Sequence, residues 1–172
     1  QKASHEPSGQ HALNDEYYER IEAIQFTMNH DDGNLLNDIE KSDIILIGVS
    51  RTSKTPTSIY LANRGYKTIN IPLVLDQKVP ESLKSQGNKI CVIGLVADAD
   101  RLADIRRNRV AIMRENNIKE YTDLNSIKEE VAKSKKLFNK YKWPIIDVTR
   151  KSVEETAASI IKMHEIYSNN VK

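Results

Sequence analysis

The sequence has little of three features that would each indicate a particular class of protein. Cys91 is the one cysteine among 172 residues, so it cannot form an internal disulfide, and its apolar neighbours predict a small buried side chain in a reducing, cytoplasmic compartment. No apolar run approaches the roughly 20 residues of a membrane span, and no charged segment followed by an apolar one opens the chain. A net charge of +2 and an aromatic content of 6% do not favour nucleic-acid binding. A catalytic thiol, a membrane anchor and a nucleic-acid partner are therefore not expected.

The rest of the composition is that of a globular domain. With 39% hydrophobic and 29% charged residues, a chain of 172 residues can bury a substantial core, and a second domain is not expected. The start is rich in serine, glycine and histidine and lacks an initiator methionine, which suggests a fragment of a longer protein. We therefore expect a loose leading segment over residues 1–13 and one folded domain over residues 14–172.

The most informative stretch is residues 43–58, where an apolar strand sequence runs directly into a polar loop. A phosphate-binding P-loop has the pattern G-x-x-x-x-G-K-[ST], and Gly48, Lys54 and Thr55 have the required spacing. Ser53 takes the place of the second glycine. The stretch predicts a nucleotide site, although any α/β protein also makes polar turns between a strand and a helix. The predicted nucleotide-binding residues are Gly48, Val49, Ser50, Arg51, Thr52, Ser53, Lys54 and Thr55.

The chemistry of phosphate binding explains the residue types in this loop. A tight turn at Gly48 directs successive backbone N–H groups at one anion, and the positive end of the following helix adds to their effect. Lys54 would reach the terminal phosphates, and the Thr55 hydroxyl would bind Mg²⁺. Arg51 adds a charge that could stabilise a phosphoryl group during transfer. Ser53 would need left-handed backbone dihedrals, which cost a non-glycine residue more.

Apolar runs and helical periodicities alternate along the chain. The apolar runs predict strands at residues 44–47, 68–71, 90–95 and 145–148. Helices are predicted from a cap at Asn14 or Asp15, after the loop, at 81–85, at 100–115, from 124 and from 152. Strands separated by helices imply a parallel sheet with right-handed crossovers, whose ligands bind beyond the carboxyl ends of the strands. The predicted fold class is α/β, a three-layer P-loop-kinase-like domain with a mainly parallel sheet.

Outside the loop, several residues have both a structural and a functional interpretation. Asp31 and Asp32 could form an ordinary turn at a helix end, or supply a carboxylate beside an incoming hydroxyl. Asp98 follows the third apolar run and could cap the next helix or bind Mg²⁺. The arginines of that helix could form a solvated face or a lid over phosphates. They are Arg101, Arg106, Arg107 and Arg109.

Four blocks of the sequence occur in the order found in one protein family. They are residues 24–33, 43–74, 101–109 and 143–157. With these blocks, the chain resembles the bifunctional regulatory proteins of pyruvate phosphate dikinase and phosphoenolpyruvate synthase. The resemblance covers nearly the whole chain, and members of that family carry a further N-terminal segment ahead of the position where Gln1 begins.

The resemblance implies a reaction, its ligands and its partners. Such proteins are serine/threonine kinases that use ADP to phosphorylate a Thr beside the catalytic His of the partner enzyme, which inactivates it. They are also phosphorylases that remove this phosphate with inorganic phosphate and release pyrophosphate. The implied ligands are ADP, phosphate and Mg²⁺, and the implied partner is pyruvate phosphate dikinase or phosphoenolpyruvate synthase, with a homodimer as a further expectation. The expected catalytic residues are Asp31, Asp32, Arg51 and Lys54, and the expected Mg²⁺ ligands are Thr55 and Asp98.

Two other classes of function fit the same residues. A small-molecule P-loop kinase would share the sheet, the loop and the arginine-rich helix, but would use ATP and a metabolite without a partner protein. A non-catalytic nucleotide-binding module would bind ADP without phosphorylating anything. Residue types alone do not distinguish ADP from ATP as the phosphoryl donor.

Overall fold

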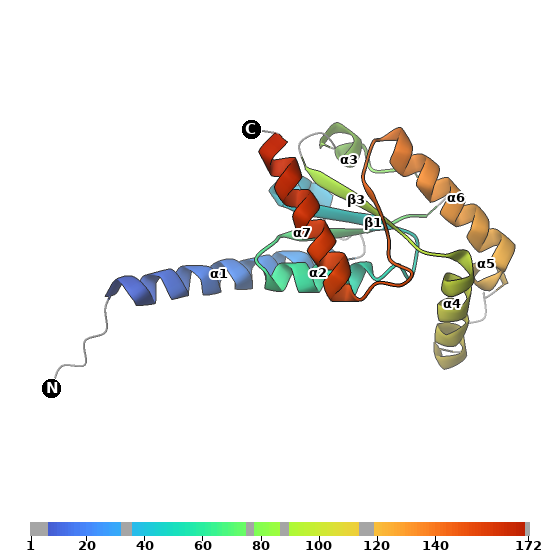
Figure 1. The fold of residues 1–172 in the computed structure, drawn as a ribbon, viewed down its shortest axis with the longest axis horizontal. Coiled ribbons are helices and arrows are strands. Elements are labelled where there is room, and N and C mark those ends of the chain that lie inside the picture. The colour runs from blue at the N-terminus through green and yellow to red at the C-terminus, as the bar shows by residue number, and fades with distance from the viewer. Residues whose placement is uncertain (1–6, 32–35, 75–77, 87–89, 114–118, 171–172) are drawn as a thin grey trace.

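The computed structural model of the protein contains a four-stranded sheet with helices on both faces (Figure 1). It describes residues 7–31, 36–74, 78–86, 90–113 and 119–170. The strands are β1 (Ile44–Gly48), β2 (Thr68–Pro72), β3 (Cys91–Val96) and β4 (Ile145–Asp147). They lie in the order β2-β1-β3-β4, and every neighbouring pair is parallel. The predicted α/β, P-loop-kinase-like fold with its parallel sheet is confirmed.

The helices connect these strands and extend beyond them. They are α1 (Pro7–Asn29), the 3-10 helix η2 (Leu36–Lys41), α2 (Lys54–Asn63), α3 (Glu81–Gln86), α4 (Ala99–Met113), α5 (Lys119–Thr122), α6 (Leu124–Lys140) and α7 (Val153–Asn170). The sequence analysis does not predict η2 or α5, although it predicts α3, which is as short as η2. None of the described helices is long and apolar enough to cross a membrane.

Helix α1 begins earlier than the sequence predicts. It starts at Pro7, inside the segment that we expected to be loose, rather than at Asn14 or Asp15. Proline is well tolerated in the first turn of a helix, because the N–H that it lacks has no helical partner there. The first part of α1 extends away from the rest of the domain (Figure 1).

The strands of the sheet are buried because helices cover both of its faces. Ile44 of β1 belongs to a core cluster with Leu61 of α2 and Ile160 of α7. The next residue, Ile45, belongs to a second cluster with Phe138 of α6. Successive residues of a strand point to opposite faces, so these two clusters are the two cores of a three-layer domain.

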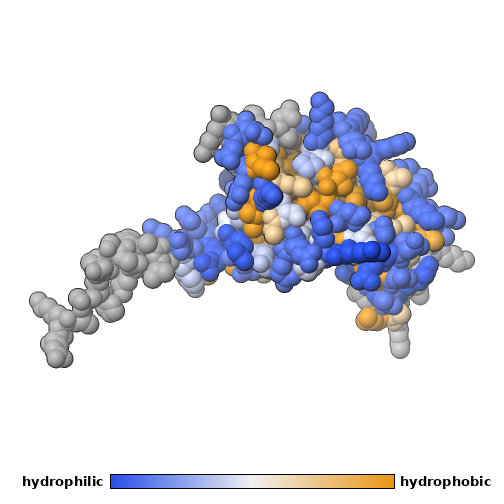
Figure 2. All heavy atoms as spheres, in the orientation of Figure 1, coloured by the Kyte–Doolittle hydropathy of each residue, from blue (hydrophilic) through white to orange (hydrophobic). Residues whose placement is uncertain are grey.

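The surface differs between α1 and the body of the domain. On the face shown in Figure 2, the coloured part of α1 is mostly hydrophilic, whereas hydrophobic side chains show around α7. Ile166 of α7 is 55% exposed. Single exposed apolar side chains are normal for a globular protein and by themselves indicate no partner.

The register of the sheet brings the candidate site together at one edge. Gly48 at the end of β1 lies opposite Pro72 at the end of β2, so the loop after β1 and the segment after β2 leave the sheet side by side. Gly65, with a φ of 92°, follows the end of α2 and turns the chain back toward β2. The loop and the first turn of α2 are thereby held at the carboxyl edge of the sheet.

Candidate functional site

The loop after β1 begins at Gly48, where the backbone passes close to β3. A Cβ atom at this position would lie 2.6 Å from Leu95 O and 2.9 Å from Thr52 Oγ1. Leu95 O belongs to the backbone of a central strand and cannot move aside. The first position of the P-loop pattern therefore requires glycine because of close packing, and not because of a positive φ.

Two residues inside the loop have left-handed backbone dihedrals. Arg51 has a φ of 72°, and Ser53 has a φ of 61° and a ψ of 27°. This conformation costs a non-glycine residue roughly 1–2 kcal/mol, so the loop holds strain at the position where the pattern has its second glycine. Ser53 is also the N-cap of α2, but its side chain makes no capping hydrogen bond. The side chain therefore does not occupy the N–H groups of the first turn, which an anion could use.

Lys54 folds back across the loop that precedes it. The residue is 6% exposed, and its Nζ donates to Val49 O at 2.8 Å and to Thr52 Oγ1 at 3.4 Å. Both of these partners are uncharged, and they position the ammonium group. The arrangement places a positive charge inside the curve of the loop, as the predicted contact with terminal phosphates requires.

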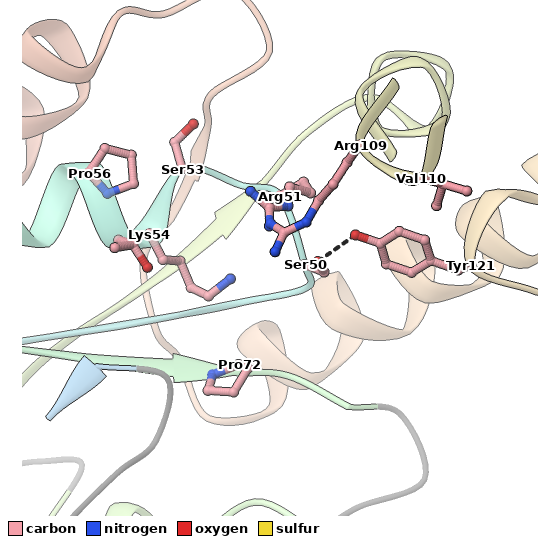
Figure 3. Close-up of a pocket in the computed structure, with 10 residues that line it drawn as sticks. Ser50, Arg51, Ser53, Lys54, Pro56, Pro72, Arg109, Val110 and Tyr121 are labelled. Atoms are coloured by element: carbon pink, nitrogen blue, oxygen red, sulfur yellow. Dashed lines mark hydrogen bonds between the residues drawn. The ribbon is translucent and has the colours of Figure 1, made fainter. Parts of the chain in front are cut away.

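A pocket of about 420 Å³ lies beside the loop (Figure 3). Arg51 and Lys54 of the loop and Arg109 of α4 line it, and none of its described lining residues is acidic. In Figure 3, Arg51 and Arg109 extend toward one another from the loop and from α4. Positive charges that converge in one pocket favour an anion between them. The other lining residues are Ser50, Ser53, Thr55, Pro56, Pro72, Val110 and Tyr121.

Arg106 supports the loop and is not among the residues that line the pocket. It is 1% exposed and makes a bidentate ion pair with Glu130 of α6, with N–O distances of 3.2 Å and 2.9 Å. Its Nη2 also donates to Ser50 O at 3.2 Å, and its guanidinium lies 4.7 Å from the centre of the Tyr121 ring. The Tyr121 hydroxyl lies 3.0 Å from Ser50 Oγ. Helices α4, α5 and α6 therefore fix the first half of the loop.

The arginines of α4 divide between the two interpretations of their sequence pattern. Arg109 lines the pocket, which is the position that the lid interpretation predicts. Arg101 and Arg107 are exposed, as in a solvated helix face, and Arg107 lies 3.6 Å from Asp104 in an ion pair. Arg106 fits neither interpretation, because it is buried against a carboxylate of another helix.

Asp31 contacts the other end of the loop. Thr55 Oγ1 donates to Asp31 Oδ1 at 3.0 Å. Asn70 of β2 donates from Nδ2 to the same Asp31 oxygen at 2.7 Å and to Thr55 Oγ1 at 2.9 Å. Asp31 is not among the lining residues of the pocket, but Thr55 is. The structure therefore brings a carboxylate to the threonine that the P-loop pattern assigns to Mg²⁺.

The end of α1 is anchored so that Asp31 reaches this position. His30 is 3% exposed and stacks on Phe26, with ring centres 4.0 Å apart and His30 Nδ1 2.6 Å from Phe26 O. Thr27 Oγ1 accepts a hydrogen bond of 3.1 Å from the Thr68 N–H of β2. The bond from Thr68 fastens the last turn of α1 to the strand that also carries Asn70, and the His30 contacts hold the end of the helix itself.

The structure does not place either of the other two predicted acidic residues at the pocket. Asp32 lies outside the residues that the structure describes. Asp98 is exposed and precedes α4. Its backbone N–H donates to Thr149 Oγ1 at 2.9 Å, and its carbonyl accepts from the Leu102 N–H at 3.0 Å. It is not among the lining residues of the pocket, and its Mg²⁺ role stays a prediction.

The predicted burial of Cys91 is confirmed. The residue is 4% exposed in β3, and burial raises the pKa of its thiol to about 11. The thiol is therefore neutral at ordinary pH and unsuited to nucleophilic chemistry.

Sequence reasoning missed three residues of this site, Asn70, Tyr121 and Glu130. Asn70 is a polar residue inside an otherwise apolar strand sequence, and it is 1% exposed. Since buried polar groups need hydrogen-bond partners, that position could have been marked as a candidate. Tyr121 and Glu130 carry no such signal, because their partners lie far away in the sequence.

Comparison with known proteins finds relatives along nearly the whole chain. The family model described as kinase/pyrophosphorylase matches residues 1–161. Two proteins named "Putative pyruvate, phosphate dikinase regulatory protein" come from Pelagibacter ubique, 68% identical over 99% of this chain, and from Erythrobacter litoralis, 48% identical over 100% of it. A protein of the same name from Chelativorans is 51% identical over 90% of this chain. The chain spans 62% of the length of each of the first two and 56% of the third.

Proposed function

This chain belongs to the kinase/pyrophosphorylase family, and on that premise we propose that it both phosphorylates and dephosphorylates an enzyme of phosphoenolpyruvate metabolism. The proposed target is pyruvate phosphate dikinase, which the names of the relatives contain, or phosphoenolpyruvate synthase. In the kinase direction, ADP gives its β-phosphoryl group to a Thr hydroxyl beside the catalytic His, and AMP leaves. In the phosphorylase direction, inorganic phosphate takes that phosphoryl group, and pyrophosphate leaves.

The observation that carries this proposal is the cationic pocket beside the strained loop. Arg51, Lys54 and Arg109 line it, and the backbone of the loop has left-handed residues at two positions. Phosphoryl transfer depends mainly on positioning and on neutralising charge on the phosphate oxygens. Positive side chains and turned backbone N–H groups supply both functions.

One phosphate-binding loop can serve both reactions. The β-phosphate of ADP and an incoming inorganic phosphate are both tetrahedral anions, and each must lie in line with the oxygen of the same Thr side chain. A pocket of about 420 Å³ can hold the phosphate-bearing part of a nucleotide with the reacting groups. The two reactions therefore need no second anion site.

Asp31 is the proposed base for the incoming hydroxyl. Its Oδ1 accepts hydrogen bonds from Thr55 and Asn70, and no hydrogen bond within the described residues uses its Oδ2. A carboxylate with one anchored oxygen can take the proton of the Thr hydroxyl with the other as the phosphoryl group arrives. Asp32 is proposed for the same chemistry on the strength of the sequence block alone.

Mg²⁺ is the metal that this site would hold. Thr55 Oγ1 and the Asp31 carboxylate are oxygen donors 3.0 Å apart, and Mg²⁺ prefers such hard oxygen ligands. The described residues contain no cluster of three or more His, Cys, Asp or Glu that could hold a metal. Mg²⁺ in phosphoryl-transfer sites needs few protein ligands, because phosphate oxygens and water complete its shell. When bound through Thr55, the ion would neutralise charge on the phosphates.

Chromatographic analysis of nucleotides tests the proposal against its alternatives. The chain is incubated with ADP and the dikinase or the synthase, with ATP and the same enzymes, and with inorganic phosphate and the phosphorylated enzyme. We expect AMP in the first reaction and pyrophosphate in the third, with the phosphate located on the partner by mass spectrometry. ADP formed from ATP, with no AMP from ADP, would instead support a small-molecule kinase. ADP binding without either reaction would support a non-catalytic module.

A further inference from the structure

Asn70 lies in a buried triangle with two residues of the proposed site. It is 1% exposed on β2, opposite Leu46 of β1, and Asp31 and Thr55 come to it from the end of α1 and the first turn of α2. The hydrogen bonds close a ring: Asn70 to Asp31 at 2.7 Å, Asn70 to Thr55 at 2.9 Å, and Thr55 to Asp31 at 3.0 Å. Three separate elements therefore meet at one side-chain amide.

The orientation of this amide is determined by its neighbours. Nδ2 has two hydrogens, and the two bonds to Asp31 and Thr55 use both of them. The opposite orientation would place Asn70 Oδ1 2.7 Å from a carboxylate oxygen, with two acceptors facing each other. In the observed orientation Oδ1 is buried and has no hydrogen-bond partner among the described residues. Such an orphan acceptor is unfavourable for stability, so a purely structural role does not explain the residue well.

We propose that Asn70 is a positioning residue that holds the Asp31 carboxylate against the Thr55 hydroxyl in its reactive orientation. This inference rests on the proposed function, in which Asp31 accepts the proton of the partner's hydroxyl. With Oδ1 fixed by two donors, the Asp31 side chain cannot rotate about its terminal bond without losing both hydrogen bonds. Asn70 thereby sets the direction of Oδ2 and also keeps Thr55 beside the loop, while its own side chain touches no reacting atom.

The test uses two substitutions of Asn70 and one control on the same strand. Asn70→Ala removes both donors, and Asn70→Asp keeps the shape but sets a carboxylate against Asp31. Thr68→Val is the matched control: Thr68 is 0% exposed, lies two positions away on the same face of β2, and bonds Tyr66 O through its hydroxyl. The substitution keeps the backbone N–H of residue 68, which is the group that binds Thr27. Each variant is measured for kinase kcat, for the KM of ADP and for melting temperature.

A positioning role predicts a split between kcat and KM. Asn70→Ala should lower kcat by about tenfold or more and leave the KM of ADP within about twofold, because misplacing a catalytic group slows the reaction without removing nucleotide contacts. Thr68→Val should lower the melting temperature and leave kcat unchanged. An unchanged kcat in Asn70→Ala, at a temperature where the variant is folded, would overturn the inference.

A stability cycle tests the contact without any enzymatic assay. Asn70→Asp should lower the melting temperature, and the double variant D31N/N70D should recover much of that loss, because the amide and the carboxylate exchange places. We expect D31N/N70D to recover stability but not kcat, because its carboxylate would lie at position 70 on β2 and not at position 31. If the chain itself makes no AMP from ADP, the proposed function fails, and the cycle then decides only whether Asn70 holds the Asp31 carboxylate. The inference is overturned if Asn70→Asp lowers the melting temperature equally in the unchanged chain and in the D31N variant.

Discussion

The two ends of the loop after β1 are held in opposite ways. At its start, the buried guanidinium of Arg106 donates a hydrogen bond to Ser50 O and is itself paired with Glu130. At its end, the carboxylate of Asp31 accepts a hydrogen bond from Thr55. The loop thus has a positive support on one side and a negative group on the other. In the proposed function, the proton of the incoming hydroxyl goes to the second side, whereas Arg106, which is paired with Glu130 and lies outside the pocket lining, supports the loop without contacting the phosphates.

The two supports also differ in how deeply they are buried. Arg106 is 1% exposed, so removing its partner would leave an uncompensated charge in the interior, which is strongly destabilising. Asp31 is partly exposed at the end of α1, so its charge retains some contact with solvent. We therefore expect substitutions at the start of the loop to affect folding first, and substitutions at its end to affect catalysis first.

The largest effect is expected at the charge between the two ends. Lys54→Ala should lower the transfer rate by about 10³-fold or more, because the phosphates lose a fixed positive charge during transfer. ADP binding should weaken by at least about tenfold, the value of one charge-assisted hydrogen bond. Calorimetric titration and the transfer assay measure the two effects. Lys128→Ala, an exposed lysine of α6, is the control and should change neither. Unchanged ADP affinity and unchanged transfer in Lys54→Ala would remove the P-loop assignment.

The next largest effect is expected at the acidic end. Asp31→Asn should cut the kinase rate by roughly 10²-fold, the usual scale for the loss of a general base. ADP affinity and melting temperature should stay close to those of the unchanged chain, because the amide can still accept a hydrogen bond from Thr55. Stopped-time assays with both partner enzymes measure the rate. If the rate stays intact, Asp31 is a structural turn residue and Asp32 is the next carboxylate to replace, followed by Asp98 if Asp32→Asn is also active.

At the start of the loop the expected effect is on stability. Glu130→Gln leaves Arg106 buried without a charged partner and should cost about 3 kcal/mol. For a chain of this length, that corresponds to a fall in melting temperature of roughly 6–12 °C. Glu129→Gln is the matched control, since Glu129 pairs with Lys133 at 2.8 Å on the surface and should contribute little. Equal melting temperatures for the two variants would contradict the contrast between the loop ends.

Local sequence patterns predicted the fold and the loop after β1, but they did not predict which residues of other helices hold that loop. Apolar runs and motif spacing are patterns of contiguous residues. They predicted the strands and the position of the loop after β1 correctly. Arg106 shows the limit: its place in an arginine-rich helix indicated a solvated face or a lid, but its burial depends on Glu130 of another helix. Asp98 and Asp31 show the same limit, because only the packing of α1 on β2 decides which carboxylate reaches Thr55.

The smallest effect concerns the strain in the loop itself. Ser53→Gly should raise stability by about 1 kcal/mol at most, or 2–4 °C in melting temperature, because glycine adopts a positive φ without a Cβ clash. Part of this gain is offset by the greater freedom of glycine in the unfolded chain. Lys142→Gly is the matched control, since Lys142 has a φ of 57° in a turn after α6. Both variants should gain similar stability, and ADP affinity should stay within about twofold in each, because the Ser53 side chain makes no capping bond. A loss of ADP affinity confined to Ser53→Gly would show that the Ser53 hydroxyl contacts the phosphates and that the strain is retained for binding.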